Sequence, residues 1–172
     1  YSKLGWNVLS IPGIGQVEIG AWYIPLFGLV VAFTTFAANE TDGLDGLLAG
    51  TLASSFAAFG LIALLQGKTE LAAFCGTILG SLLAFLWFNI YPARFFMGDT
   101  GAMALGMTIG ILAFLTDTVF ILPLIALVPY IEGLSAVIQI GSKKLRHGKK
   151  IFLSAPIHHH FEAMGWPSYK VT

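Results

Sequence analysis

The sequence predicts an all-α polytopic membrane protein that crosses the bilayer about five times. Of its 172 residues, 56% are hydrophobic and only 10% are charged, whereas a soluble domain carries about 25% charged residues. The mean hydropathy is +0.81, and the apolar residues are grouped into long runs. The formal net charge is zero, so the overall charge gives no indication of a nucleic-acid partner.

The expected elements form one transmembrane segment, residues 1–172, without a convincing internal repeat. Residues 1–18, rich in Gly and Pro, are typical of an outer loop or a short hairpin. Glycine is frequent inside the apolar runs, and small residues let helices pack closely in lipid. The expected spans are about residues 19–38, 47–66, 71–88, 102–116 and 119–140, and a long polar loop covers residues 142–167.

Three polar clusters, residues 39–46, 89–101 and 142–167, interrupt the apolar sequence. Two spans separate each cluster from the next, so all three are expected on the same side of the membrane. The last cluster is rich in cations, and the positive-inside rule makes this side cytoplasmic. These cations could serve only topology and attraction to lipid headgroups, or they could bind an anionic substrate. They are Lys143, Lys144, Arg146, Lys149 and Lys150.

The first cluster places Asp42 and Asp45 three residues apart, so on a helix both would lie on one face. Asp42 could simply cap the following helix, because acidic groups are favoured near a helix start. Glu40 adds further negative charge, and such crowding is unfavourable unless a cation or a donor-rich ligand compensates for it. A helix cap and a ligand site both remain open interpretations.

The second cluster ends with Asp99, where the loop enters the next span. Asp99 could cap this helix, but an ionisable residue at the membrane edge is also a functional candidate. Phe95 and Phe96 are adjacent and would face different directions, so one can pack while the other stacks on a planar ligand. Asn89 offers a paired donor and acceptor for the edge of a base.

The third cluster contains three consecutive histidines, His158–His160. Adjacent side chains diverge on regular structure, and a tetrahedral zinc site normally needs further Cys or His ligands. The single cysteine, Cys75, lies inside a predicted span, so zinc is disfavoured. Histidine can instead contact phosphate or transfer a proton. Gln139 and Glu132 share one stripe of the last span; Gln139 is expected near the site and Glu132 within the bundle.

Acids, cations and an aromatic ring on one cytoplasmic surface are typical of metal-assisted phosphoryl transfer. Mg²⁺ binds through one or two carboxylates plus substrate phosphates. The sequence contains no Walker loop and no dinucleotide-binding glycine pattern. A transporter or channel is an alternative of a different class, but it would need charges along a path through the bilayer, and only Glu132 lies deep in a span.

Three stretches carry a family resemblance: NETDGLDGL, FNIYPARFFMGDTGAMALG and APIHHHFEAMGWP. They closely resemble the phospho-N-acetylmuramoyl-pentapeptide transferases, within the superfamily of polyprenyl-phosphate N-acetylhexosamine-1-phosphate transferases. The histidine motif is the most specific of the three. The resemblance implies transfer of phospho-MurNAc-pentapeptide from UDP-MurNAc-pentapeptide to undecaprenyl phosphate. With Mg²⁺ as cofactor, this reaction yields lipid I and UMP for peptidoglycan synthesis.

The resemblance also implies roles for individual residues. Asp99 matches the magnesium-binding aspartate of the family, and Phe96 matches an aromatic residue that stacks on uracil. The implied catalytic residues are Asp99, Asp42, Asp45 and His159. The implied substrate-binding residues are Asn39, Gly43, Leu44, Asn89, Phe96, Gln139, His158, His159 and His160.

Members of this family are multi-pass proteins of the bacterial inner (plasma) membrane, with a cytoplasmic active site. The resemblance implies a homodimer and a target of nucleoside antibiotics. The family has roughly ten spans and an N-terminal paired-aspartate motif, which this chain lacks. The chain is therefore expected to be the C-terminal portion of a longer enzyme and incomplete without the remaining half. Glu40 also stands where an uncharged residue is expected.

Two other interpretations stay open beside this one. A related transferase that uses another UDP-N-acetylhexosamine shares the aspartate motifs, although the histidine triplet followed by Phe161-Glu162 favours the muramoyl enzyme. A noncatalytic scaffold built from half of the fold is the other.

Overall fold

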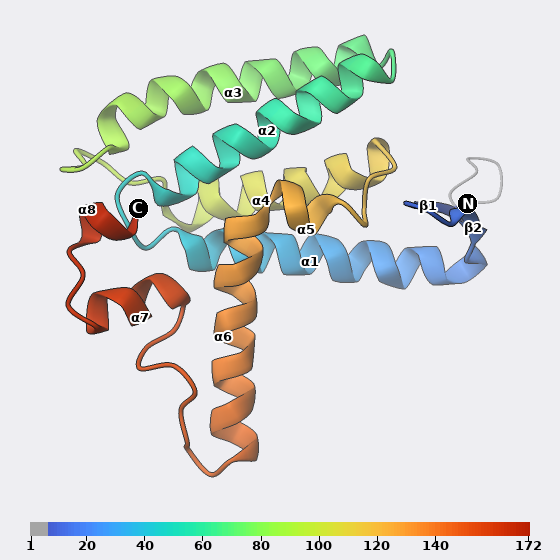
Figure 1. Ribbon diagram of the computed structural model, residues 1–172. Coiled ribbons are helices and arrows are strands. Elements are labelled where there is room, and N and C mark those ends of the chain that lie inside the picture. The colour runs from blue at the N-terminus through green and yellow to red at the C-terminus, as the bar shows by residue number, and fades with distance from the viewer. Residues whose placement is uncertain (1–6) are drawn as a thin grey trace.

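The computed structural model describes residues 7–172, and within them a two-stranded hairpin precedes a series of helices (Figure 1). The predicted all-α membrane class is confirmed. The elements are β1 (Val8–Ile11), β2 (Gly15–Glu18), the 3-10 helix η2 (Gly20–Trp22), α1 (Tyr23–Thr41), α2 (Leu47–Leu65), α3 (Thr69–Asn89), α4 (Gly98–Leu115), α5 (Leu122–Ile125), α6 (Leu127–Leu145), α7 (Ile157–Ala163) and α8 (Ser168–Val171).

Four helical segments within residues 7–172 are long and apolar enough to cross a membrane. They are Gly20–Thr41, Leu47–Leu65, Thr69–Asn89 and Gly98–Leu115. These segments overlap the first four expected spans. The last begins earlier than the expected residue 102, because Gly98, with φ of +71°, takes a left-handed conformation that glycine adopts easily and turns the chain into α4.

The fifth expected span, residues 119–140, is not one continuous helix, and here the prediction is corrected. Ala126, with φ of −107° and ψ of 43°, separates α5 from α6. Pro129 lies in the first turn of α6, where its missing N–H is tolerated but would interrupt a helix continuing from α5. In Figure 1, α6 runs crosswise to α1 and extends away from the long helices.

Glycines allow α1 to lie close to both α4 and α6. A β-carbon at Gly106 of α4 would lie 2.6 Å from the Ala38 Cβ, and one at Gly110 would lie 2.5 Å from the Thr34 Oγ1. A β-carbon at Gly133 of α6 would lie 2.8 Å from a β-carbon of α1. Close approach at small residues is how helices associate in lipid, and here it packs α1 against both α4 and α6.

The β1–β2 hairpin is tied to the end of the bundle where α4 finishes. The Ser10 N–H donates to Asp117 Oδ1 at 3.2 Å, and the Ser10 hydroxyl donates to Asp117 Oδ2. At the same end, Gln66 Nε2 donates to the Thr116 carbonyl at 2.7 Å. These hydrogen bonds join the hairpin and the α2–α3 turn to the turn after α4.

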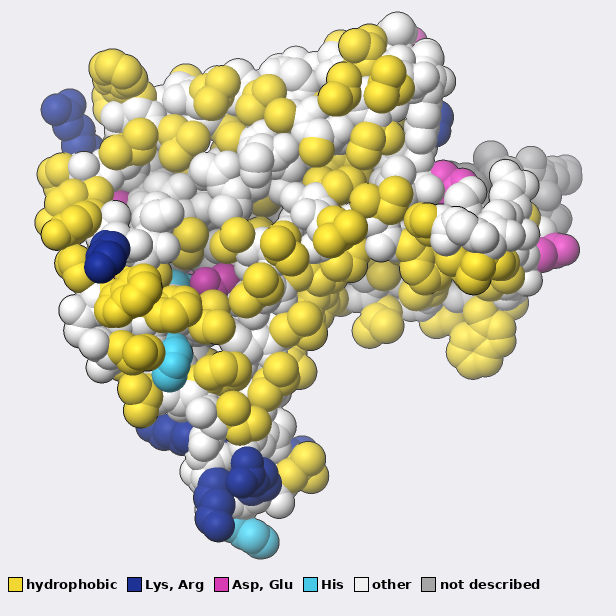
Figure 2. Space-filling model, in the orientation of Figure 1, with side chains coloured by type: hydrophobic (Ala, Val, Ile, Leu, Met, Phe, Trp, Pro, Cys, Tyr) yellow, Lys and Arg dark blue, Asp and Glu magenta, His cyan; other side chains and the backbone are white. Residues whose placement is uncertain are grey.

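The first two polar clusters and the second half of the third meet at the opposite end, whereas the first half of the third cluster lies at the far end of α6. The α1–α2 loop, the α3–α4 loop and α7–α8 lie together there, far from the hairpin (Figure 1). Hydrophobic side chains cover much of the visible surface (Figure 2); Trp87 of α3, for example, is 82% exposed. Such a surface is typical of contact with lipid or with another protein segment, in agreement with a multi-pass membrane protein.

Candidate active site

The two aspartates of the first cluster fasten the α1–α2 loop to the α3–α4 loop. Asp42 Oδ2 accepts a hydrogen bond from the Gly98 N–H at 3.0 Å, and Asp45 Oδ2 accepts one from the Ala93 N–H at 2.9 Å. Hydrogen bonds to ionised groups are stronger than neutral ones. Helix α2 begins without a side-chain cap, so Asp42 does not cap the helix that follows it but holds the start of α4.

Asn89 joins the same two loops from the end of α3. Its Oδ1 accepts from the Gly46 N–H at 3.1 Å, and its Nδ2 donates to the Phe95 carbonyl at 3.0 Å. The side chain is buried. Both polar groups of this amide bind backbone, so Asn89 fixes the two loops, and its expected contact with a base edge stays a prediction.

Asp99 and Asp42 form the electrostatic centre of the site. Asp99 is exposed in the first turn of α4, which has no side-chain cap, so the capping interpretation of Asp99 is wrong. Burial raises the pKa of Asp42, the Gly98 hydrogen bond opposes this, and the charge of Asp99 raises that pKa further. A carboxyl group whose ionisation is opposed by burial and by a neighbouring carboxylate is stabilised by a cation.

These carboxylates fit the way proteins hold Mg²⁺, which takes oxygen ligands and typically uses one or two carboxylates together with substrate phosphates. Among residues 7–172, no group of three or more His, Cys, Asp or Glu side chains is arranged to hold a metal by itself. Asp42 and Asp99 therefore suit a metal that a phosphate substrate helps to bind.

We expect the raised pKa of Asp42 to appear in the pH dependence of stability. A carboxyl group whose pKa is higher in the folded state contributes stability that is complete below its unfolded pKa and is lost as the pH rises through its folded pKa. The contribution of Asp42 to the melting temperature of the protein in detergent should therefore fall as the pH rises above 3.8, the ordinary value. Asp42→Asn should flatten this fall, whereas Glu70→Gln at the far end should not; equal slopes in all three proteins would contradict the assignment.

The two phenylalanines before α4 have different surroundings, as expected for adjacent residues. Phe95 stacks on Phe88, with ring centroids 5.4 Å apart and planes inclined by 24°, and meets Phe85 edge-on at 5.5 Å. Phe96 is 66% exposed. The packing of Phe95 fixes the loop, and the ring of Phe96 is left accessible to a planar ligand.

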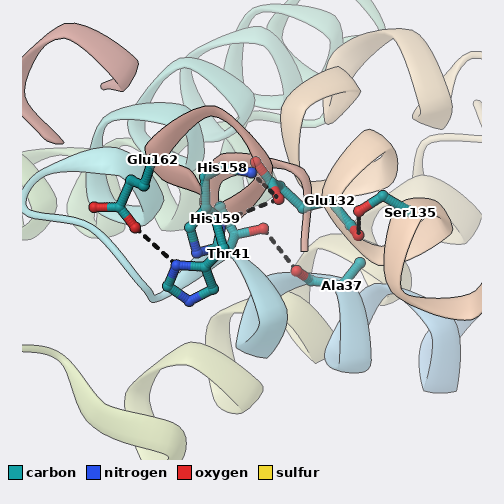
Figure 3. A network of polar contacts seen from close by, with 7 residues as sticks. All are labelled: Ala37, Thr41, Glu132, Ser135, His158, His159 and Glu162. Atoms are coloured by element: carbon teal, nitrogen blue, oxygen red, sulfur yellow. Dashed lines mark hydrogen bonds and ion pairs between the residues drawn. The ribbon is translucent and has the colours of Figure 1, made fainter. Parts of the chain in front are cut away.

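Helix α7 carries the histidines, and Figure 3 shows the first two in different environments. The His158 side chain is 1% exposed, and its Nδ1 lies 3.0 Å from Glu132 Oε2 on α6. The His159 side chain is 44% exposed, and its Nδ1 lies 2.8 Å from Glu162 Oε2. His158 therefore faces the interior, although it was expected to bind substrate, and His159 is the histidine that a ligand can reach.

Glu162 orients His159 from within the same helix. The Ser168 hydroxyl donates to Glu162 Oε1 at 2.7 Å. This hydrogen bond, followed by the one with His159, lowers the pKa of the Glu162 carboxyl. A carboxylate on Nδ1 fixes the ring orientation and leaves Nε2 for other chemistry.

Gln139 and His160 shape the loop between α6 and α7. Gln139 Oε1 accepts from the N–H groups of Ile151 and Phe152 at 3.0 and 3.1 Å, and its Nε2 donates to the Phe152 carbonyl at 2.8 Å. His160 Nδ1 accepts from the Leu153 N–H at 3.1 Å. Both residues were expected to bind substrate. In the structure the Gln139 amide and His160 Nδ1 form hydrogen bonds with backbone atoms of the loop.

An open pocket of about 170 Å³ lies between this loop, α6 and the end of α1. Glu40 and two lysines, Lys143 and Lys150, border it beside Gln139. The unexpected charge of Glu40 thus faces a region that also contains cations.

The remaining predicted residues lie in the last turns of α1 and in the α1–α2 loop. Gly43 touches the ring of His158: a β-carbon at Gly43 would lie 2.9 Å from His158 Cε1 and nearer still to its Nε2. Leu44 is buried. The Oδ1 of Asn39 is buried and has no hydrogen-bond partner among the described residues.

Fold and site together define a multi-pass membrane protein that gathers carboxylates, an exposed aromatic ring and histidines at one end. The chain belongs to glycosyl transferase family 4, whose sequence profile matches residues 1–117. It is 44% identical to the phospho-N-acetylmuramoyl-pentapeptide-transferase of Chloroflexus aurantiacus strain J-10-fl over 173 residues, which cover 96% of this chain and 47% of that protein.

Other relatives with the same name show a similar match. The protein of Clostridium perfringens strain 13 is 44% identical over 99% of this chain and 54% of its own length. That of Geobacillus sp. strain WCH70 is 43% identical over 99% of this chain and 53% of its own length. The chain thus spans about half the length of these curated relatives.

Sequence reasoning missed the partners of the histidines. Glu132 was expected to pair within the bundle, but its partner is His158 on α7, and Glu162 was not considered as the partner of His159. A carboxylate that stands alone among the apolar residues of a helix needs a buried partner. The sequence therefore indicates that Glu132 has such a partner, but it does not indicate which residue this is.

Proposed function

We propose that this chain is part of an enzyme that transfers phospho-MurNAc-pentapeptide from UDP-MurNAc-pentapeptide to undecaprenyl phosphate, giving lipid I and UMP. The names of its relatives support this proposal. The observation that carries it is the meeting of Asp42, at the end of α1, with the start of α4, which carries Asp99 in its first turn.

In this reaction an oxygen of the acceptor phosphate forms a bond to the phosphorus attached to the sugar, and the bond from that phosphorus to the oxygen of UMP breaks. Asp99 and Asp42 would hold Mg²⁺, which supplies neutralisation of the phosphate charge. Asp45 keeps the α1–α2 loop against Ala93. We assign His159 to contact with the diphosphate, because its ring is oriented by Glu162 and accessible.

The proposed setting is the bacterial inner membrane, with this end of the bundle facing the cytoplasm. Cations at the end of α6, such as Lys143 and Lys144, support that orientation because cytoplasmic loops are rich in Lys and Arg. We further propose that the site is completed by a partner region as long as this chain, that the enzyme forms a homodimer, and that nucleoside antibiotics bind the site.

A transfer assay in detergent tests the function. The chain is compared with the same chain co-expressed with the N-terminal half of a relative, using UDP-MurNAc-pentapeptide, undecaprenyl phosphate and Mg²⁺. UMP release only from the co-expressed halves is the expected result. Release with UDP-N-acetylglucosamine instead would identify a related transferase, and folded protein that neither binds nucleotide nor releases UMP would contradict the proposal.

Replacement of Phe96 by alanine should weaken UMP binding, because the exposed ring is assigned to stacking on uracil. Stacking of a base on an aromatic side chain contributes about 1–3 kcal/mol, which corresponds to an increase in Kd of about 5- to 150-fold. Calorimetric titration of the co-expressed protein with UMP measures the change. Phe120→Ala is the control, since Phe120 is 49% exposed near the hairpin end; an unchanged UMP affinity for Phe96→Ala would remove Phe96 from the nucleotide site.

A further inference from the structure

The buried pair of Glu132 and His158 takes no part in the chemistry proposed above. Glu132 comes from α6 and His158 from α7, and their side chains are 5% and 1% exposed. Replacing a buried ion pair with apolar residues is often neutral or even stabilising. Stability alone is therefore a weak explanation for this pair, and its geometry points to a positional role.

One carboxylate oxygen holds His158 at two points. Glu132 Oε2 lies 3.0 Å from His158 Nδ1 and 3.3 Å from the backbone nitrogen of His158, which donates to it. The carboxylate oxygen that accepts from the backbone N–H can also accept from Nδ1, so this geometry suits a ring that carries its proton on Nδ1. This double contact fixes both the ring and the first turn of α7 relative to α6.

The other side of the ring faces the α1–α2 loop. His158 Nε2 is buried without a hydrogen-bond partner among the described residues, and the ring touches Gly43 where a β-carbon would otherwise lie. The ring of His159 is 4.1 Å from that of His158, measured between centroids. The position of His158 therefore determines where α7 and its exposed histidine stand relative to Asp42 and Gly43.

We propose that Glu132 is a positioning residue for the transfer reaction. It holds His158 with Nδ1 protonated and the ring pressed on Gly43, and it thereby docks α7 onto the α1–α2 loop. His159 is then presented beside the carboxylate site. This inference rests on the proposed transferase function, and it assigns to Glu132 an effect that passes entirely through His158.

A double-mutant cycle on the co-expressed protein tests this dependence. Glu132→Ala and His158→Ala should each lower kcat about 10- to 100-fold, the usual effect of removing a partner that orients a functional histidine. The double variant should be no slower than His158→Ala, because coupled residues are non-additive. Glu132→Gln keeps one oxygen acceptor and should restore kcat to within a few-fold of wild type. If the kcat losses of the two single variants multiply in the double variant, the proposal is overturned.

Ser135→Ala is the matched control, because Ser135 is also buried on α6 but bonds only the backbone carbonyl of Glu132, at 2.7 Å. It should retain the wild-type kcat. A loss equal to that of Glu132→Ala would show that any buried polar change on α6 disturbs the site, and would also overturn the proposal.

A second measurement stands apart from activity. Histidine ¹⁵N NMR on the chain itself reports which ring nitrogen carries the proton, and the signal that disappears in His158→Ala identifies His158. Protonated Nδ1 is expected in wild type and Glu132→Gln, and a tautomer mixture in Glu132→Ala. An unchanged tautomer in Glu132→Ala would refute the positioning role. If no protein shows transfer but the tautomer shifts as expected, the proposed function fails while the action of Glu132 on His158 stands.

Discussion

Replacement of Asp99 by asparagine is expected to abolish Mg²⁺-dependent transfer and to leave the fold intact. Asp99 is exposed in the first turn of α4, whereas the contacts that hold the loops together are made by Asp42, Asp45 and Asn89. The substitution removes the negative charge assigned to the metal and keeps the shape of the side chain. Loss of one charge-stabilising group costs about 100- to 1,000-fold in kcat, and loss of a metal ligand should reach at least this range.

UMP release by the co-expressed protein over a range of Mg²⁺ concentrations measures the effect, with a melting curve to confirm the fold. Glu70→Gln is the control, because Glu70 is an acid in the first turn of α3, at the end away from the site. Asp99→Asn should also relieve the repulsion that raises the pKa of Asp42, so its stability should depend less on pH. Wild-type turnover by Asp99→Asn would remove Asp99 from the mechanism.

The meeting of the first two polar clusters at one end could be predicted, because two apolar helices, α2 and α3, lie between them and return the chain to the same side. Long apolar runs specify helices in lipid, where backbone groups must be satisfied within the segment. The same reasoning does not locate a break within an apolar run. Residues 119–140 are apolar enough to suggest one span, yet Pro129 and the conformation of Ala126 divide them, and prolines are also common inside transmembrane helices.

The identity of the site residues was easier to predict than their contacts. Asn89 belongs to the second polar cluster and Gln139 lies just before the third. In the structure the amide groups of both residues form hydrogen bonds with backbone atoms. The Gly46–Asn89 hydrogen bond joins residues separated by 43 positions, and local pattern holds no information about such a partner. A polar residue near a site can bind the ligand or fix the loop that does, and only tertiary geometry separates these roles.

Replacement of Gly43 by alanine is expected to impair the site through His158. Gly43 does not need glycine for a left-handed conformation, since it is absent from the glycines with positive φ among the described residues. It needs glycine for space, because the added methyl group would lie 2.9 Å from His158 Cε1 and closer to Nε2. The His158 ring cannot move away easily, because Glu132 forms hydrogen bonds with both its Nδ1 and its backbone N–H.

Either the α1–α2 loop or α7 must therefore move, and overpacking of this kind costs about 1–3 kcal/mol. Because Asp42 is adjacent to Gly43, the displacement should weaken UMP binding and transfer by about 10- to 100-fold, and should lower the melting temperature. Calorimetry with UMP and a melting curve measure both effects. Gly50→Ala is the control, since a β-carbon there meets nothing within 4 Å. A Gly43→Ala protein with wild-type stability and affinity would mean that α7 rests less closely on this loop, and the link from Glu132 through His158 to the carboxylate site would lose its physical basis.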